Sequence, residues 1–138
     1  MQKPASYGDV SETPGGNIVC VVDDDAGVLK SVGRLLESAG FEVRGFNRAK
    51  PFLEYVTSNP VPVVVLDIWM EGMTGMELLA HLCARSPRTR AIFMTGHEDR
   101  AAEATVMSAG AFAFLIKPFD DDQLLGEVHR ALSFPLQS

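Results

Sequence analysis

The sequence predicts an α/β domain built around a five-stranded parallel sheet. Short apolar runs, several of them rich in β-branched residues, alternate with longer segments in which apolar residues recur at helical spacing. Short connections join these segments, as in α/β units. This alternation is typical of parallel strands linked by helices, and right-handed crossovers then place helices on both faces of the sheet.

Five short segments have the character of strands. The first, Asn-Ile-Val-Cys-Val-Val, is a continuous apolar run, which is typical of a strand buried on both faces. The second, Phe-Glu-Val-Arg-Gly-Phe, alternates in polarity with the period of a strand. The expected strands are 17–22, 41–46, 61–66, 91–95 and 111–116.

Five longer segments carry apolar residues on one helical face. The first is expected to end at Gly40, because glycine favours the conformation that follows a helix C-terminus. Asn47 is expected to cap the second helix, in which Pro51 is tolerated in the first turn. Asp120 and Gln123 resemble a capping box at the start of the last helix. The expected helices contain residues 28–39, 52–56, 76–85, 98–110 and 124–132.

Composition limits the classes of function. A formal net charge of -6 argues against a nucleic-acid-binding surface, which would need clustered Lys and Arg. No apolar run is long enough to span a membrane, and the first residues lack the apolar stretch of a signal peptide. The two cysteines do not make a disulfide framework. We therefore expect a soluble cytoplasmic protein.

One folded domain is expected, with a tail at each end. Residues 1–16 are rich in Ser, Thr, Pro and Gly without periodicity, which predicts a flexible N-terminal tail. The folded domain is expected over 17–133. The C-terminal tail, 134–138, is too short for a second domain, so any DNA-binding effector would lie outside this chain.

Polar side chains with useful chemistry stand at the carboxyl ends of four expected strands. They are Asp23–Asp25, Asp67, Thr95 and Lys117. Because parallel strands end at the same edge of a sheet, where open α/β sheets bind ligands, these side chains are expected to meet. Each alone has a simpler explanation: Asp25 is the favoured cap of the first helix, and the others are a turn acid, a turn hydroxyl and a surface amine.

Several carboxylates in one small site suit Mg²⁺, which prefers oxygen ligands. No cluster of His or Cys has zinc spacing, so a soft metal is disfavoured. An ionised Asp in such a site can act as a nucleophile and form an aspartyl phosphate. An adjacent Lys and a Thr hydroxyl would stabilise charge on the transferring phosphoryl oxygens.

Four segments resemble, in order along the chain, the motifs of one family. They are Val-Val-Asp-Asp-Asp at 21–25, the run 63–79, Ile-Phe-Met-Thr-Gly at 92–96 and Ala-Phe-Leu-Ile-Lys-Pro-Phe-Asp at 113–120. Together they resemble the receiver domain of two-component response regulators, most of all the FixJ-type subset. The resemblance implies a doubly wound, flavodoxin-like fold with five helices and strand order 2-1-3-4-5.

The resemblance also implies a function and a set of site residues. The function is a signalling switch that accepts a phosphoryl group and turns over no external substrate. The phosphoacceptor falls on Asp67 and the acidic metal-binding pair on Asp23 and Asp24, with Mg²⁺ as the cofactor. The backbone carbonyl of Trp69 falls at the remaining protein ligand position.

The remaining roles follow from the same resemblance. Lys117 and Thr95 belong to the catalytic set, Thr95 and Phe114 form the switch, and Pro118 follows a cis peptide bond. The implied partners are a sensor histidine kinase or phosphotransfer protein and a second copy of the chain in a phosphorylation-dependent homodimer. No contact with nucleic acid or membrane is expected for this chain itself.

Two positions depart from the family pattern. Glu71 stands where the family usually has proline, so the loop after Asp67 loses a rigid φ and gains a charge. Trp69 stands where small, polar or basic residues are more common. Its indole either covers the loop or shields the acyl phosphate from water, and the sequence leaves both readings open.

Three other functions compete with the switch. A metal-dependent phosphohydrolase with an Asp nucleophile generally needs a second acid two residues later, where this chain has Trp69. A nucleotide- or flavin-binding module would need a glycine-rich phosphate loop, and neither common motif is present. A receiver that only binds partners is disfavoured by the complete set of acids and Lys117.

Overall fold

The computed structural model describes residues 17–96 and 98–133, so the tails expected at 1–16 and 134–138 lie outside the described residues. Five parallel strands form one sheet in the order β2-β1-β3-β4-β5, which confirms the predicted order. The strands are β1 (Ile18–Val22), β2 (Glu42–Phe46), β3 (Val63–Asp67), β4 (Arg90–Thr95) and β5 (Ala113–Ile116).

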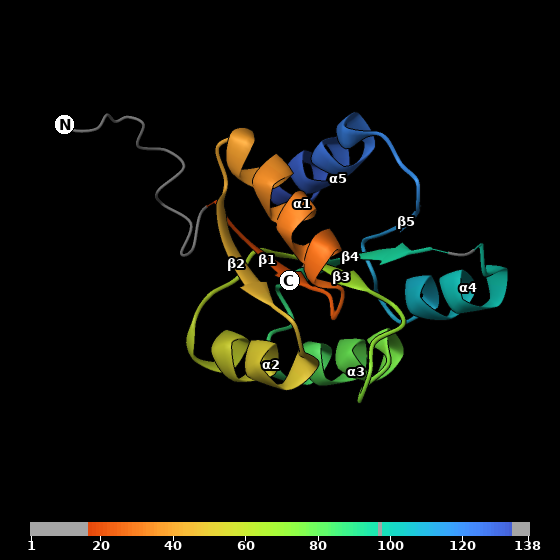
Figure 1. Ribbon diagram of the computed structural model, residues 1–138. Coiled ribbons are helices and arrows are strands. Elements are labelled where there is room, and N and C mark those ends of the chain that lie inside the picture. Colours follow the sequence, from red (N-terminus) through yellow and green to blue (C-terminus); the bar gives the residue numbers. More distant parts are fainter. Residues whose placement is uncertain (1–16, 97, 134–138) are drawn as a thin grey trace.

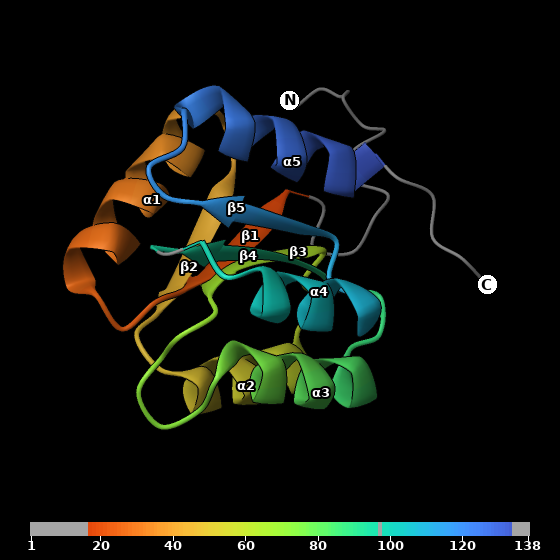
Figure 2. The ribbon, with the colours of Figure 1, turned by 90° about the vertical axis from the view of Figure 1, so that its right-hand side faces the viewer.

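Five helices cover the two faces of the sheet. They are α1 (Ala26–Ser38), α2 (Ala49–Ser58), α3 (Gly75–Arg85), α4 (Arg100–Ser108) and α5 (Asp121–Ser133). Figures 1 and 2 show α1 and α5 on one face and α2, α3 and α4 on the other. Alternate residues of β1 and β3 enter two separate apolar clusters, one for each layer of helices. β1 is apolar throughout, and β3 is apolar up to its last residue, because both of their faces are covered.

Two predicted helix boundaries are confirmed and one is wrong. Asp25 caps α1, because its Oδ1 accepts hydrogen bonds from the N–H groups of Gly27 and Val28. Gly40 follows α1 with a φ of 96°, a conformation that glycine adopts without strain. The predicted cap at Asn47 is wrong: α2 begins at Ala49, which is buried, and the N-cap is therefore one residue later than predicted.

The start of α5 shows part of the predicted capping box. The Oε1 of Gln123 accepts a hydrogen bond from the N–H of Asp120 at 2.8 Å, which is half of a capping box.

At the start of α3, by contrast, Thr74 and Glu77 form a complete capping box that was not predicted. Its Thr-x-x-Glu signal was present in the sequence. This cap fixes the end of the loop that follows β3.

Among the helices of residues 17–96 and 98–133, none is both long enough and apolar enough to cross a membrane.

The first residue of α3 approaches the sheet so closely that only glycine fits. A Cβ at Gly75 would lie 2.7 Å from Cε1 of Phe93 and 2.8 Å from the Cα of Ile68. We expect Gly75→Ala to lower the free energy of unfolding by about 1–3 kcal/mol, since backbone and a buried ring must move. Urea denaturation measures this change.

Gly126, inside α5, is the matched control for that substitution. A Cβ there meets nothing within 4 Å. We expect Gly126→Ala to raise the free energy of unfolding by about 0.5–1 kcal/mol, because alanine is the better helix former. Equal effects of the two substitutions would contradict the close approach at Gly75.

Candidate functional site

The predicted site residues lie at the carboxyl edge of the sheet, where the chain changes direction. From β1 the chain continues to β2 on one side, while β3 lies on the other side of β1. Asp23 and Asp24 follow β1, and Asp67 is the last residue of β3. In doubly wound sheets such a switch point opens a crevice that binds ligands.

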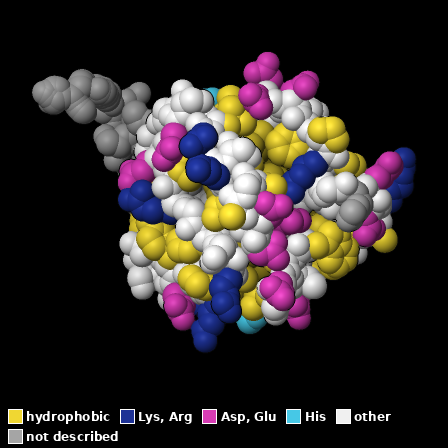
Figure 3. All heavy atoms as spheres, viewed as in Figure 1, with side chains coloured by type: hydrophobic (Ala, Val, Ile, Leu, Met, Phe, Trp, Pro, Cys, Tyr) yellow, Lys and Arg dark blue, Asp and Glu magenta, His cyan; other side chains and the backbone are white. Residues whose placement is uncertain are grey.

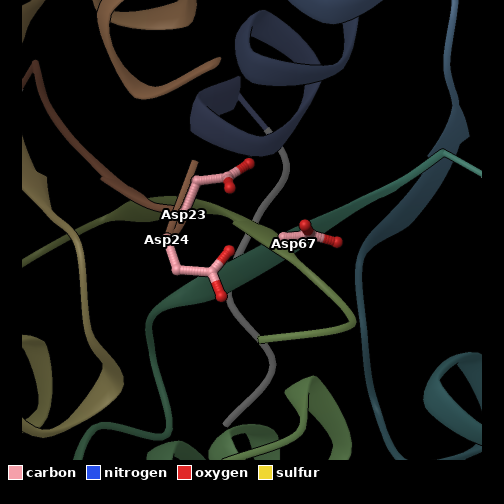
Figure 4. Close-up of side chains that lie close together, drawn as sticks. All are labelled: Asp23, Asp24 and Asp67. Atoms are coloured by element: carbon pink, nitrogen blue, oxygen red, sulfur yellow. The ribbon is translucent and has the colours of Figure 1, made fainter. Parts of the chain in front are cut away.

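The three carboxylates form one cluster. One oxygen atom from each of Asp23, Asp24 and Asp67 lies within 4.8 Å of the other two. Figure 4 shows the three side chains next to one another, and Figure 3 shows acidic side chains near the middle of the face that is turned to the viewer in Figure 1. Asp23 is buried, Asp67 is half-buried and Asp24 is exposed, so the cluster runs from the interior to the surface.

Asp23 is held inside the protein with one oxygen unsatisfied. Its Oδ1 accepts a hydrogen bond from the N–H of Asp25 at 2.9 Å. Its Oδ2 is the one buried side-chain N or O atom, among residues 17–96 and 98–133, without a hydrogen-bond partner. The Nζ of Lys117 lies 3.8 Å from it, which is an ion pair but too long for a hydrogen bond.

Burial raises the pKa of the Asp23 carboxyl above its ordinary value, and the charges of Asp67 and Asp24 raise it further. The N–H of Asp25 and the ammonium of Lys117 act in the opposite direction without cancelling the effect of burial. A buried carboxylate with an orphan oxygen is unfavourable unless a cation completes it. The site therefore favours a bound cation.

Asp67 and Asp24 are each tied to the loop that follows β3. The N–H of Trp69 donates to Oδ1 of Asp67 at 3.1 Å. The N–H of Glu71 donates to Oδ2 of Asp24 at 2.9 Å, across a separation of 47 positions in the sequence. This second bond could not be predicted from the sequence, because every residue except proline carries a backbone N–H donor.

Thr95 and Lys117 end the neighbouring strands. Thr95 is the last residue of β4 and is fully buried. Since Asp67 pairs with Met94 in the sheet, Thr95 lies one position further along the adjacent strand. Lys117 follows β5, and its N–H donates to the carbonyl oxygen of Thr95 at 2.7 Å. The peptide bond between Lys117 and Pro118 is cis, as predicted.

Phe114 lies away from the carboxylate cluster. It is in β5 opposite Phe93, whereas Thr95 pairs with Ile116, two positions nearer the carboxyl edge. Its half-buried ring packs against the cluster beneath α2, α3 and α4. The predicted switch residues, Thr95 and Phe114, therefore lie on adjacent strands but at different heights along the sheet.

The donor set fits a hard divalent cation. Three carboxylates converge, and the buried Oδ2 of Asp23 has no hydrogen-bond partner. Oxygen ligands of this kind suit Mg²⁺ better than soft metals, which prefer sulfur and imidazole.

Comparison with known families decides between the candidate functions. Residues 19–129 match the family described as response regulator receiver domain. The chain belongs to that family. Receiver domains of response regulators act as phosphorylation-activated switches, and the comparisons do not support the alternative of a phosphohydrolase.

Curated relatives resemble this receiver domain over nearly its whole length. The transcriptional regulatory protein FixJ of Bradyrhizobium diazoefficiens is 39% identical over 114 residues, which are 83% of this chain and 56% of that protein. The DNA-binding transcriptional regulator NtrC of Escherichia coli K12 is 39% identical over 116 residues, which are 84% of this chain and 25% of that protein. The chain thus spans about half the length of FixJ and a quarter of that of NtrC.

Solved receiver structures share the fold. The crystal structure of FixJ-N has a TM-score of 0.80 and 33% identity, with 88% of this chain and 97% of that chain covered. The solution structure of the beryllofluoride-activated NtrC4 receiver domain dimer has a TM-score of 0.80 and 28% identity, with coverages of 84% and 96%. The doubly wound fold and the FixJ-type resemblance of this receiver domain are therefore confirmed.

Trp69 lies in the loop beside Asp67 and is 43% exposed. It is the only tryptophan in the receiver domain, so fluorescence reports on this position alone. We expect the emission to change on addition of Mg²⁺ and again with beryllofluoride, because both alter the charge beside the indole. We also expect Trp69→Ala to shorten the lifetime of the acyl phosphate roughly fivefold, equivalent to about 1 kcal/mol of barrier, by admitting water.

The control is Trp69→Phe, which keeps an aromatic cover and should keep most of the lifetime. A silent fluorescence titration together with equal lifetimes in wild type and Trp69→Ala would reduce the indole to a cover for the loop.

Proposed function

We propose that this receiver domain accepts a phosphoryl group on Asp67 in a reaction that requires Mg²⁺. The observation that carries the proposal is the convergence of Asp23, Asp24 and Asp67 around a buried oxygen that has no hydrogen-bond partner. Asp23, Asp24, Asp67 and the backbone carbonyl of Trp69 would hold the ion. The ion supplies charge neutralisation for the phosphoryl oxygens.

Asp67 is the acid best suited to be the nucleophile. It is the last residue of β3 and is only half-buried, so its side chain remains accessible to a phosphodonor. A carboxylate oxygen attacks phosphorus, a new O–P bond forms, and the bond to the leaving group breaks with its electron pair. The product is an aspartyl phosphate, which water later hydrolyses.

Lys117 and Thr95 contribute to the charge balance of this transfer. Lys117 reaches the cluster through its ion pair with Oδ2 of Asp23. In the proposed function its ammonium exchanges that partner for a phosphoryl oxygen and neutralises part of the charge on the transferred group. The hydroxyl of the buried Thr95 donates to another phosphoryl oxygen, which draws the end of β4 toward Asp67.

The proposed partners follow from this chemistry. A sensor histidine kinase or a phosphotransfer protein donates the phosphoryl group, and the domain itself catalyses its phosphorylation and dephosphorylation without turning over an external substrate. In this role the protein acts in the cytoplasm and, by likeness to FixJ and NtrC, in transcriptional control. With a net charge of -6, the chain itself makes no contact with nucleic acid.

A conformational switch is the proposed output. We expect phosphorylation to move Thr95 and to allow the half-buried ring of Phe114 to rotate inward, which changes the face formed by α4, β5 and α5. A homodimer on that face should double the mass measured by light scattering after addition of beryllofluoride and Mg²⁺. Amide resonances around Phe114 should shift in the same sample.

Thr95→Val separates the switch from the chemistry, because it removes the hydroxyl and keeps the branched shape. We expect this variant to be phosphorylated at Asp67 but to show neither the mass change nor the shifts around Phe114. Identical masses and spectra for the free and activated wild type would refute the switch and leave phosphorylation of Asp67 intact.

A further inference from the structure

The loop that joins β3 to α3 is fixed at both ends. The side chains of Ile68 and Met70 are buried in the core. The N–H of Ile68 donates to the carbonyl oxygen of Met94 at 3.0 Å, and the N–H of Gly75 donates to the carbonyl oxygen of Ile68 at 2.7 Å. Gly72 then turns the chain with a φ of 90°. These contacts fix the position of the backbone of Glu71, which lies between Met70 and Gly72.

In this position the backbone of Glu71 contacts the carboxylate of Asp24. The N–H of Glu71 lies 2.9 Å from Oδ2 of Asp24. Asp24 is exposed, unlike Asp23, so the surrounding packing does little to select its rotamer. A hydrogen bond from a fixed backbone donor to an ionised acceptor is among the stronger kinds, and it selects one orientation of the carboxylate.

We infer that the backbone N–H of Glu71 is a positioning group that holds the Asp24 carboxylate in the acidic cluster and so increases the affinity of the site for Mg²⁺. The inference rests on the proposed function for the identity of the cation. In this inference the backbone N–H of Glu71 acts on Asp24, and the side-chain carboxylate of Glu71 is not needed for the affinity for Mg²⁺.

The consequence is a mechanical link between two sides of the site. Trp69, whose carbonyl is the proposed ligand from the loop, and Glu71 belong to the same short segment. A displacement of this segment therefore moves the carbonyl of Trp69 and releases Asp24 together. Groups that orient metal ligands commonly change affinity by about 10- to 100-fold when they are removed. The exposure of Asp24 favours the lower end of this range.

Two substitutions at one position test the inference. Glu71→Pro removes the N–H and the side chain, whereas Glu71→Ala removes the side chain and keeps the N–H. We expect the dissociation constant for Mg²⁺, measured by titration of amide resonances, to rise roughly tenfold in Glu71→Pro. In Glu71→Ala it should stay within about twofold of wild type. Equal dissociation constants for the two variants would overturn the inference.

Proline also restricts the backbone, so the same pair is compared in an Asp24→Ala background. If the N–H acts through Asp24, the Pro and Ala variants at position 71 should then bind Mg²⁺ within about twofold of each other. A tenfold difference that persists without the Asp24 carboxylate would assign the effect to loop strain and overturn the inference.

The resonance of the Glu71 amide proton gives a reading that does not depend on proline. Asp24→Ala should move that resonance upfield and speed its exchange with solvent, with no such change for Glu77, whose N–H donates to Thr74. An unchanged Glu71 resonance would contradict the hydrogen bond. Failure of wild type itself to bind Mg²⁺ would count against the proposed function instead, since the hydrogen bond to Asp24 would still be observed.

Discussion

Asp67→Asn is expected to reduce phosphoryl incorporation from acetyl phosphate by roughly 10³-fold or more, as is typical when a covalent nucleophile is removed. Asparagine keeps the shape of the side chain at the end of β3, and its Oδ1 can still accept the N–H of Trp69. What is lost is the negative oxygen that attacks phosphorus. The increase in intact mass after incubation with acetyl phosphate and Mg²⁺ measures the reaction.

Asp25→Asn is the matched control. Asp25 is next to the cluster in sequence, but its carboxylate caps α1 by accepting the N–H groups of Gly27 and Val28. Asparagine is an equally good cap. This variant should therefore be phosphorylated within about twofold of the wild-type rate. Full labelling of Asp67→Asn, or loss of labelling in Asp25→Asn, would show that the acceptor has been misassigned.

Asp23→Asn is expected to stabilise the metal-free domain and to remove its response to Mg²⁺. Burial raises the pKa of Asp23, so the charged form is less favourable in the folded chain than in the unfolded one. The resulting contribution to stability is full at acidic pH and is lost as the pH rises through the folded-state pKa. At pH 7 the neutral amide avoids that cost, so we expect the variant to unfold at a higher temperature than wild type when no metal is present.

Thermal unfolding in EDTA and in Mg²⁺ measures both effects. Wild type should gain about 2.7 kcal/mol when Mg²⁺ is present at 100 times its dissociation constant, and Asp23→Asn should gain little. The advantage of the variant in EDTA should vanish at a pH below the ordinary pKa of aspartate, where both chains carry a neutral group. Asp24→Asn should weaken the Mg²⁺ response without abolishing it, and its gain in EDTA should be smaller, because Asp24 is exposed.

A less stable Asp23→Asn variant in EDTA, combined with a normal response to Mg²⁺, would contradict this account. It would mean that the ion pair with Lys117 outweighs the burial of the charge.

The fold and the main site residues were predictable because their signals are local in the sequence. Parallel strands buried on both faces read as short apolar runs, and their carboxyl ends meet at one edge, so the acids that follow β1 and β3 were expected to converge. The cluster of Asp23, Asp24 and Asp67 has that arrangement. The cis bond before Pro118 was expected from the family resemblance.

Other features depend on contacts that residue identity does not encode. The hydrogen bond from Glu71 to Asp24 uses a backbone N–H, which every residue except proline carries. The buried oxygen of Asp23 becomes an orphan only because packing excludes water from it. The start of α2 lies one residue later than predicted because the backbone of Arg48 is extended, so Arg48 occupies the N-cap position, and it does so without a side-chain hydrogen bond.

Locating the phosphoryl group on the chain tests the central claim most directly. After incubation of the wild-type protein with acetyl phosphate, borohydride reduces an aspartyl phosphate to homoserine, which tandem mass spectrometry can place in the sequence. We predict homoserine at position 67 in the presence of Mg²⁺ and none in EDTA. Homoserine at position 23 or 24, or equal modification of Asp67 with and without Mg²⁺, would contradict the account.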